Sequence, residues 1–136
     1  MNLLAGKSLV VLNSSNETIE FLTDWFEQQG MTVHAATVTE FRKGGRDIAA
    51  FIAMAAPDVI IFDVSFPYVA NWEYLQRLRQ DGPLKNVAVV MTTPNAEVLR
   101  TVSSVLNPET THEIVGKPAD MQQLTAMVRN QIVAAV

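Results

Sequence analysis

The stretch that decides the fold is "DVIIFD", residues 58–63, which reads as a strand buried on both of its faces. Between its two aspartates stand only apolar residues, most of them β-branched. Such an uninterrupted run is typical of a central strand in a parallel sheet that helices cover on both sides. The closing carboxylate, Asp63, would then lie at the carboxyl edge of the sheet, where open α/β folds bind their ligands.

Apolar strand patterns and amphipathic helix patterns alternate on both sides of this run. The predicted strands cover residues 8–12, 31–36, 58–63, 86–92 and 113–116, and the predicted helices cover 17–29, 46–56, 71–81, 96–106 and 119–135. Strict alternation implies parallel strands joined by helical crossovers. We therefore expect an α/β fold with a five-stranded, doubly wound parallel sheet in the flavodoxin-like order 2-1-3-4-5. Its ligand crevice should lie where strands 1 and 3 end side by side.

The composition is that of one globular domain spanning residues 1–136. The chain is 49% hydrophobic and 18% charged, which is enough apolar material for a core. No apolar run approaches the roughly 20 residues that a membrane span needs, and the N-terminus has no secretory pattern. The absence of cysteine excludes disulfides and thiolate metal sites. We expect a cytoplasmic protein without a membrane partner.

The charge pattern argues against a nucleic-acid partner, because the formal net charge is −4 and the basic residues are scattered. Only Arg42, Lys43 and Arg46 stand close together. We expect this cluster to be a solvated loop, since Gly44 and Gly45 within it disfavour a helix.

Several polar side chains follow the predicted strands at the point where each strand ends. They are Asn13 and Ser14 after the first strand, Asp63 after the third, Thr92 after the fourth and Lys117 after the fifth. Parallel strands end at the same edge of a sheet, so these side chains should meet in one crevice. One carboxylate, one ammonium group and several hydroxyls would then face a common ligand.

The motifs that carry these residues resemble the receiver domain of two-component response regulators, over about residues 7–134. The family's phosphoacceptor motif is an aspartate that ends an apolar strand with proline four residues later, as in "DVIIFDVSFP". Its switch hydroxyl ends strand 4, which is Thr92 in "VVMTTP", and its Lys-Pro pair is Lys117 in "GKP". The resemblance implies that Asp63 is the phosphoacceptor, with Lys117 and Thr92 as its companions.

The sequence departs from this family in the loop after the first strand. The two acidic residues that receivers carry there fall on Asn13 and Ser14. Receivers combine that pair with the phosphoacceptor and a main-chain carbonyl, here that of Ser65, to hold Mg²⁺. Mg²⁺ prefers oxygen ligands and usually relies on one or two carboxylates, of which only Asp63 is left. The resemblance therefore implies a degenerate, weak Mg²⁺ site, weak or absent phosphotransfer, and no other cofactor.

A second interpretation of the same loop is structural. "SSNE", residues 14–17, fits the capping-box pattern S-x-x-E that satisfies backbone amides at the start of a helix. Ser14 would then be the cap of the helix that follows. This interpretation is compatible with a lost metal site.

Three hypotheses about the function remain open. The first is a receiver-like signalling domain whose partner is a histidine kinase or a downstream signalling protein. The second is a phosphorylation-independent interaction module on the same fold, with Ile114 contributing to a homodimer face. The third is a flavodoxin-like phosphate or nucleotide binder, since "NSSNET" is rich in amides and hydroxyls. We do not expect an enzyme, because neither His34 nor His112 has an acid or serine at a recognisable spacing.

Overall fold

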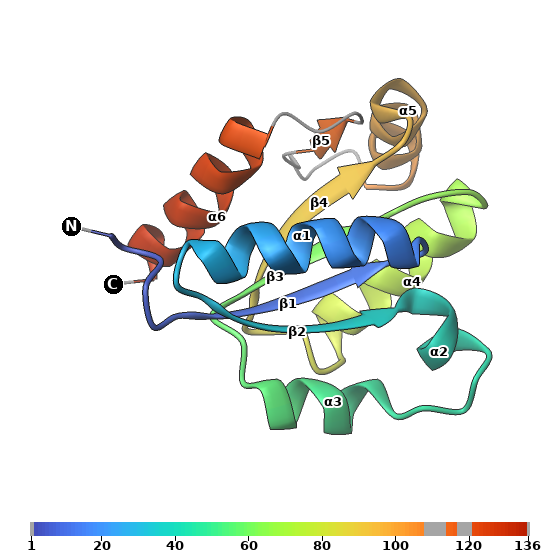
Figure 1. The fold of residues 1–136 in the computed structure, drawn as a ribbon. Helices are drawn as coiled ribbons and strands as arrows, with labels where there is room; N and C mark the ends of the chain where they lie inside the picture. The colour runs from blue at the N-terminus through green and yellow to red at the C-terminus, as the bar shows by residue number, and fades with distance from the viewer. Residues whose placement is uncertain (1, 108–113, 117–120, 136) are drawn as a thin grey trace.

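The computed structural model describes residues 2–107, 114–116 and 121–135, and Figure 1 shows the arrangement of their helices and strands. In chain order the elements are β1 (Ser8–Asn13), α1 (Asn16–Gln28), β2 (Thr32–Thr37), α2 (Val38–Arg42), α3 (Ile48–Ala55), β3 (Val59–Asp63), α4 (Tyr68–Gln80), β4 (Ala88–Thr93), α5 (Ala96–Leu106), β5 (Ile114–Gly116) and α6 (Met121–Ala134). Within the described ranges, no helix is both long and apolar enough to cross a membrane.

The strands form a parallel sheet in the order β2-β1-β3-β4-β5. Four longer strands make its body, and the three-residue β5 pairs with β4 at the edge. The predicted doubly wound α/β class is confirmed. The run "DVIIFD" supplies β3, which lies between β1 and β4 and is buried along its whole length.

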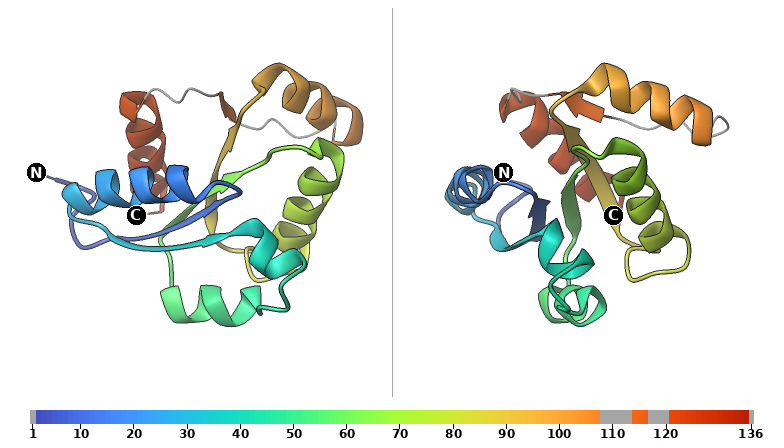
Figure 2. Two further views of the ribbon diagram at one scale, coloured as in Figure 1. Left: turned by 45° about the vertical axis from the view of Figure 1, so that its right-hand side comes forward. Right: turned by 90° about the vertical axis from the view of Figure 1, so that its right-hand side faces the viewer.

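Helices cover both faces of the sheet, as the apolar strands required. Successive side chains of a strand point to opposite faces, so Leu9 and Val11 of β1 pack in one layer and Val10 and Leu12 in the other. The first layer is closed by α1 and α6, and the second by α2, α3, α4 and α5. Figure 2 shows α1 and α4 on opposite sides of the sheet.

The segment between β2 and β3 differs from the prediction. Instead of one helix over 46–56, it forms the short helix α2 and then α3, which begins only at Ile48. Asp47 caps α3 by accepting hydrogen bonds from two backbone amides of its first turn. The left-handed conformation of Gly45, with φ +75°, separates the two helices. The expectation of a solvated loop was therefore wrong for Arg42, which is the last residue of α2.

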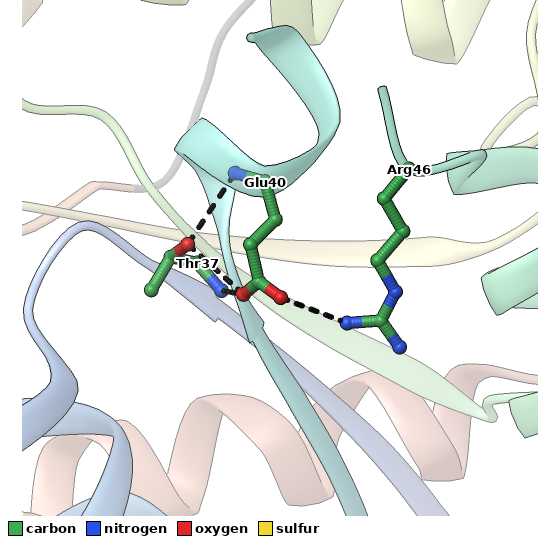
Figure 3. A network of polar contacts seen from close by, with 3 residues as sticks. All are labelled: Thr37, Glu40 and Arg46. Carbon is green, nitrogen blue, oxygen red and sulfur yellow. Dashed lines mark hydrogen bonds and ion pairs between the residues drawn. The ribbon is translucent and has the colours of Figure 1, made fainter. Parts of the chain in front are cut away.

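The start of α2 is fixed by a capping box between Thr37 and Glu40 (Figure 3). The backbone N–H of Thr37 donates to Glu40 Oε2 at 2.7 Å, and the backbone N–H of Glu40 donates to Thr37 Oγ1 at 3.4 Å. Arg46 forms an ion pair with the other carboxylate oxygen of Glu40 at 3.1 Å. These reciprocal bonds explain how a helix of five residues forms at all.

The same bonds make α2 sensitive to acid. The hydrogen bonds from the backbone and side chain of Thr37, and to a lesser degree Arg46, lower the pKa of Glu40 below its ordinary value of 4.5. A carboxylate with a lowered folded-state pKa stabilises the fold above its unfolded-state pKa. The contribution of Glu40 is therefore complete above about pH 4.5, and it is lost as the pH falls through the lowered value.

We expect Thr37→Ala to destabilise the protein by about 1 kcal/mol, because it removes the hydroxyl that caps α2. Thr37→Ser keeps a hydroxyl at the cap and is the matched control, with an expected loss of less than about 0.5 kcal/mol. Urea unfolding followed by circular dichroism measures both free energies. Equal losses in the two variants would show that the hydroxyl is not what stabilises this helix.

Candidate functional site

The predicted acceptor and switch residues lie next to each other at the carboxyl edge of the sheet. Asp63 ends β3 and Thr92 is its register partner on β4. The hydroxyl of Thr92 donates a hydrogen bond of 2.7 Å to Asp63 Oδ1, and each residue is only 2% exposed. The structure thus places a buried carboxylate against a hydroxyl group, as the spacing of the two strands predicted.

In the loop after β1, one serine faces this site and the next serine caps the helix that follows. Asn13 Oδ1 accepts a hydrogen bond of 2.9 Å from the backbone N–H of Ser15, and Ser15 Oγ accepts one of 3.3 Å from Thr18 N. Ser15 is therefore the cap of α1, and the interpretation of Ser14 as that cap was wrong by one residue. Ser14 is left to face the site, where its Oγ accepts a hydrogen bond from Ser65 Oγ at 3.3 Å.

The carbonyl of Ser65, the backbone ligand that the resemblance implied, is already engaged. Asn71 Nδ2 donates a hydrogen bond of 2.8 Å to it from the first turn of α4. The Oδ1 of Asn71 in turn accepts a hydrogen bond from Arg42 Nη1. A polar chain therefore runs from α2 through a buried asparagine to the loop after β3.

A pocket of about 140 Å³ lies over these groups. Asp63, Ser14 and Ser65 line it. Two basic side chains, Arg42 and Lys43, line it as well, and we call these two residues its basic wall. Further lining comes from Val38, Thr39, Phe66, Pro67 and Asn71. Among the described lining residues, Asp63 is therefore the one acid beside two cations.

This donor set lacks the negative charge on which Mg²⁺ sites usually rely. The ion needs several oxygen ligands in octahedral geometry, with carboxylates to offset its charge. Besides Asp63 the pocket offers only neutral oxygens, among them the Ser65 carbonyl, one of whose two lone pairs accepts a bond from Asn71. The Nδ2 of Asn13 is a buried donor without an acceptor among the described residues, and a donor cannot ligate a cation. Across the described ranges, no group of three histidine or acidic residues could hold a metal ion.

The aromatic ring of Tyr74 makes a cation–π contact with Arg42 of the basic wall. The guanidinium lies 5.5 Å from the centre of the Tyr74 ring, which is a cation–π distance. Burial raises the pKa of Tyr74 above its ordinary value of 10.0, and the nearby guanidinium opposes this only in part. The ring therefore stays neutral at physiological pH and presents its face to the cation.

Of the predicted site residues, Asp63, Thr92, Ser14 and Ser65 come together. Asn13 is buried at the end of β1, and Lys117 lies outside the described residues. Sequence reasoning did not find Arg42, Lys43 and Asn71. One signal was present for Asn71, because it shares the helix stripe of Leu75 and Leu78 and is polar where that stripe is apolar.

Fold and site together define a parallel α/β domain with a buried carboxylate, Asp63, at the carboxyl edge of its sheet. The chain belongs to the response regulator receiver domain family, whose model matches residues 10–129. It is therefore a receiver domain of two-component signalling. A search among curated proteins gives no match. Family membership favours the receiver interpretation over the flavodoxin-like phosphate or nucleotide binder.

Solved structures agree on the fold. The receiver domain of Francisella response regulator 1452 is similar with a TM-score of 0.71 and 16% identity, covering 96% of this chain and 100% of that one. The Vibrio cholerae chemotaxis protein CheY4 gives a TM-score of 0.67 and 19% identity, covering 93% and 98%. A response regulator from Thermotoga maritima gives 0.68 and 19%, again covering 93% and 98%. Identities this low establish the shared fold alone.

Proposed function

We propose that this chain is a receiver-type signalling domain in which Asp63 is the formal phosphoacceptor and Mg²⁺-dependent phosphotransfer is weak or absent. The observation that carries the proposal is the pocket over Asp63. It has Ser14 in the place of an acid and is lined by Arg42 and Lys43. A site of this charge repels the divalent cation that the family uses.

The chemistry of phosphoryl transfer supports this proposal. The transferring group carries negative charge that must be neutralised as it moves to the carboxylate, and a metal ion normally shares that task with a lysine. We assign the lysine role to Lys117 and the switch hydroxyl to Thr92, which already bonds to Asp63. Without a well-held metal ion, acceptance of a phosphoryl group should slow by orders of magnitude.

The second candidate is a phosphorylation-independent interaction module on the same fold. The hydrogen bond from Thr92 to the buried Asp63 favours it, because the carboxylate is stabilised without a phosphoryl group. In both candidates the domain acts through contact with another protein, which is either a histidine kinase or a downstream signalling protein. We retain a homodimer through β5 and α6 within this proposal. The domain, which we take to be residues 1–136 and cytoplasmic, would then signal without catalysis and without nucleic acid.

Incubation with a small-molecule phosphodonor and Mg²⁺, followed by intact-mass analysis, tests the proposal. The expected result is little or no gain of one phosphoryl group, both in the native chain and in Asp63→Asn. A near-complete adduct that disappears in Asp63→Asn would overturn it, because the pocket would then support transfer as it stands. Chemical removal of the adduct by hydroxylamine would identify it as an acyl phosphate.

A further inference from the structure

The basic wall of the pocket over Asp63 is not among the groups to which phosphoryl transfer was assigned above. Arg42 and Lys43 stand at the end of α2, and both line the pocket. Neither forms an ion pair with any residue in the described ranges, where the single ion pair joins Arg46 to Glu40. The third basic residue of the cluster is therefore engaged elsewhere, while these two are available to a ligand.

The guanidinium of Arg42 is held in position before any ligand arrives. One of its five N–H groups donates to the buried Asn71, and its central carbon lies over the Tyr74 ring. Asn71 is itself fixed on the Ser65 carbonyl at 2.8 Å. The remaining N–H groups of such an anchored guanidinium can bind an anion with little loss of side-chain freedom.

The size of the pocket limits the ligand. A volume of about 140 Å³ is well below the roughly 300 Å³ at which sites for drug-sized molecules begin. A whole nucleotide is too large for it, whereas one tetrahedral anionic group fits. Arginine binds phosphate through two parallel N–H groups, and the Ser14 hydroxyl, which accepts the hydrogen bond from Ser65, can donate as well.

We propose that this pocket binds a phosphate-type dianion directly, without a metal ion, through Arg42 and Lys43. The proposal concerns a non-covalent ligand and does not depend on whether Asp63 accepts a phosphoryl group. The dianion is either free phosphate or the phosphate group of a phosphomonoester. At the mouth of the pocket, Phe66 is 82% exposed and offers an apolar surface to the organic part of such an ester.

The test is a titration of the ¹⁵N-labelled native chain with inorganic phosphate, in EDTA and at constant ionic strength, with the amide signals of Ser14 and Ser65 as the readout. Saturable shifts are expected. Arg42→Gln and Lys43→Gln should each raise the dissociation constant by about tenfold or more. Lys85→Gln makes the same charge change on an exposed lysine outside the pocket and should leave the constant unchanged.

Three results would overturn the proposal. They are the absence of saturable shifts, binding that needs Mg²⁺, and an equal loss of affinity in Lys85→Gln. Thermal unfolding of each variant separates lost binding from lost folding, and Lys43→Gln is the safer variant because its side chain makes no hydrogen bond within the described residues. Phenyl phosphate distinguishes the two sources of the dianion. Tighter binding that Phe66→Ser abolishes indicates an aromatic phosphomonoester, and equal binding supports free phosphate.

Discussion

Replacing Asn13 and Ser14 together by aspartate is expected to make this chain accept a phosphoryl group in Mg²⁺ at least about a hundredfold faster than the native chain. The change restores the two carboxylates that the family places beside the phosphoacceptor. Asn13 and aspartate have the same shape, and Asn13 Nδ2 has no acceptor among the described residues, so its loss costs no hydrogen bond there. Ser14 is exposed and borders Ser65, so a carboxylate can be accommodated.

The same variant should make the stability of the protein depend on Mg²⁺. Without metal, a buried aspartate at position 13 would stand near Asp63, and two like charges in low dielectric destabilise the fold. A bound divalent ion relieves that repulsion. Its binding to the folded state alone then raises the melting temperature. The native chain is expected to melt at the same temperature with and without Mg²⁺.

Intact-mass analysis over time, with a small-molecule phosphodonor, measures the gain. The matched control is the same double variant carrying Asp63→Asn, which should gain nothing. Asn13→Asp alone should lie between the native chain and the double variant. If the double variant reacts no faster than the native chain, the missing acids are not what limits phosphotransfer, and the basic wall of Arg42 and Lys43 would be the next element to replace.

Trp72→Ala is expected to cost about 3–5 kcal/mol of the free energy of unfolding. Trp72 is fully buried in the layer closed by α4 and α5, and its Nε1 donates a hydrogen bond of 2.7 Å to Asn107 Oδ1. Truncation leaves a large cavity and an asparagine that loses its donor. Since domains of this kind are stabilised by about 5–15 kcal/mol, the variant should be close to unfolding at 37 °C.

The other tryptophan provides the comparison. Trp25 is only half-buried, on α1, and its Nε1 donates a hydrogen bond of 2.9 Å to Thr125 Oγ1. Trp25→Ala removes the same atoms and a similar hydrogen bond from a site that water can refill, so about 1–2 kcal/mol is expected. Urea unfolding followed by circular dichroism compares the two. Equal losses would show that burial of Trp72 does not dominate the core under α4.

The sheet was predictable because its signal is local. Apolar runs such as residues 58–63 identify strands covered on both faces, and their alternation with helices leaves few topologies open. The short helix α2 was not predictable from the same patterns. Gly44 and Gly45 argue against a helix, and one does end just before them. The capping box of Thr37 and Glu40, however, starts α2 at Val38, eight residues before the predicted helix over 46–56.

The part of the site that is formed by residues at the ends of strands was predictable from the sequence. Asp63 and Thr92 meet because neighbouring parallel strands end together. The predicted cap of α1 was wrong by one residue. Ser14 and Ser15 follow each other in the sequence, and only the backbone conformation decides which of them bonds to Thr18. The basic wall could not be found in this way, because the position of Arg42 depends on how α2 packs against α4.

A titration of the native chain with Mg²⁺, followed through the amide signals of Asp63 and Ser65, tests the central claim most directly. The claim is that the pocket over Asp63 has lost its metal site and carries positive charge in its place. The predicted result is no saturable shift at these amides up to millimolar Mg²⁺, with clear saturation once positions 13 and 14 are aspartate. Saturation in the native chain at the low millimolar or micromolar level would contradict the claim.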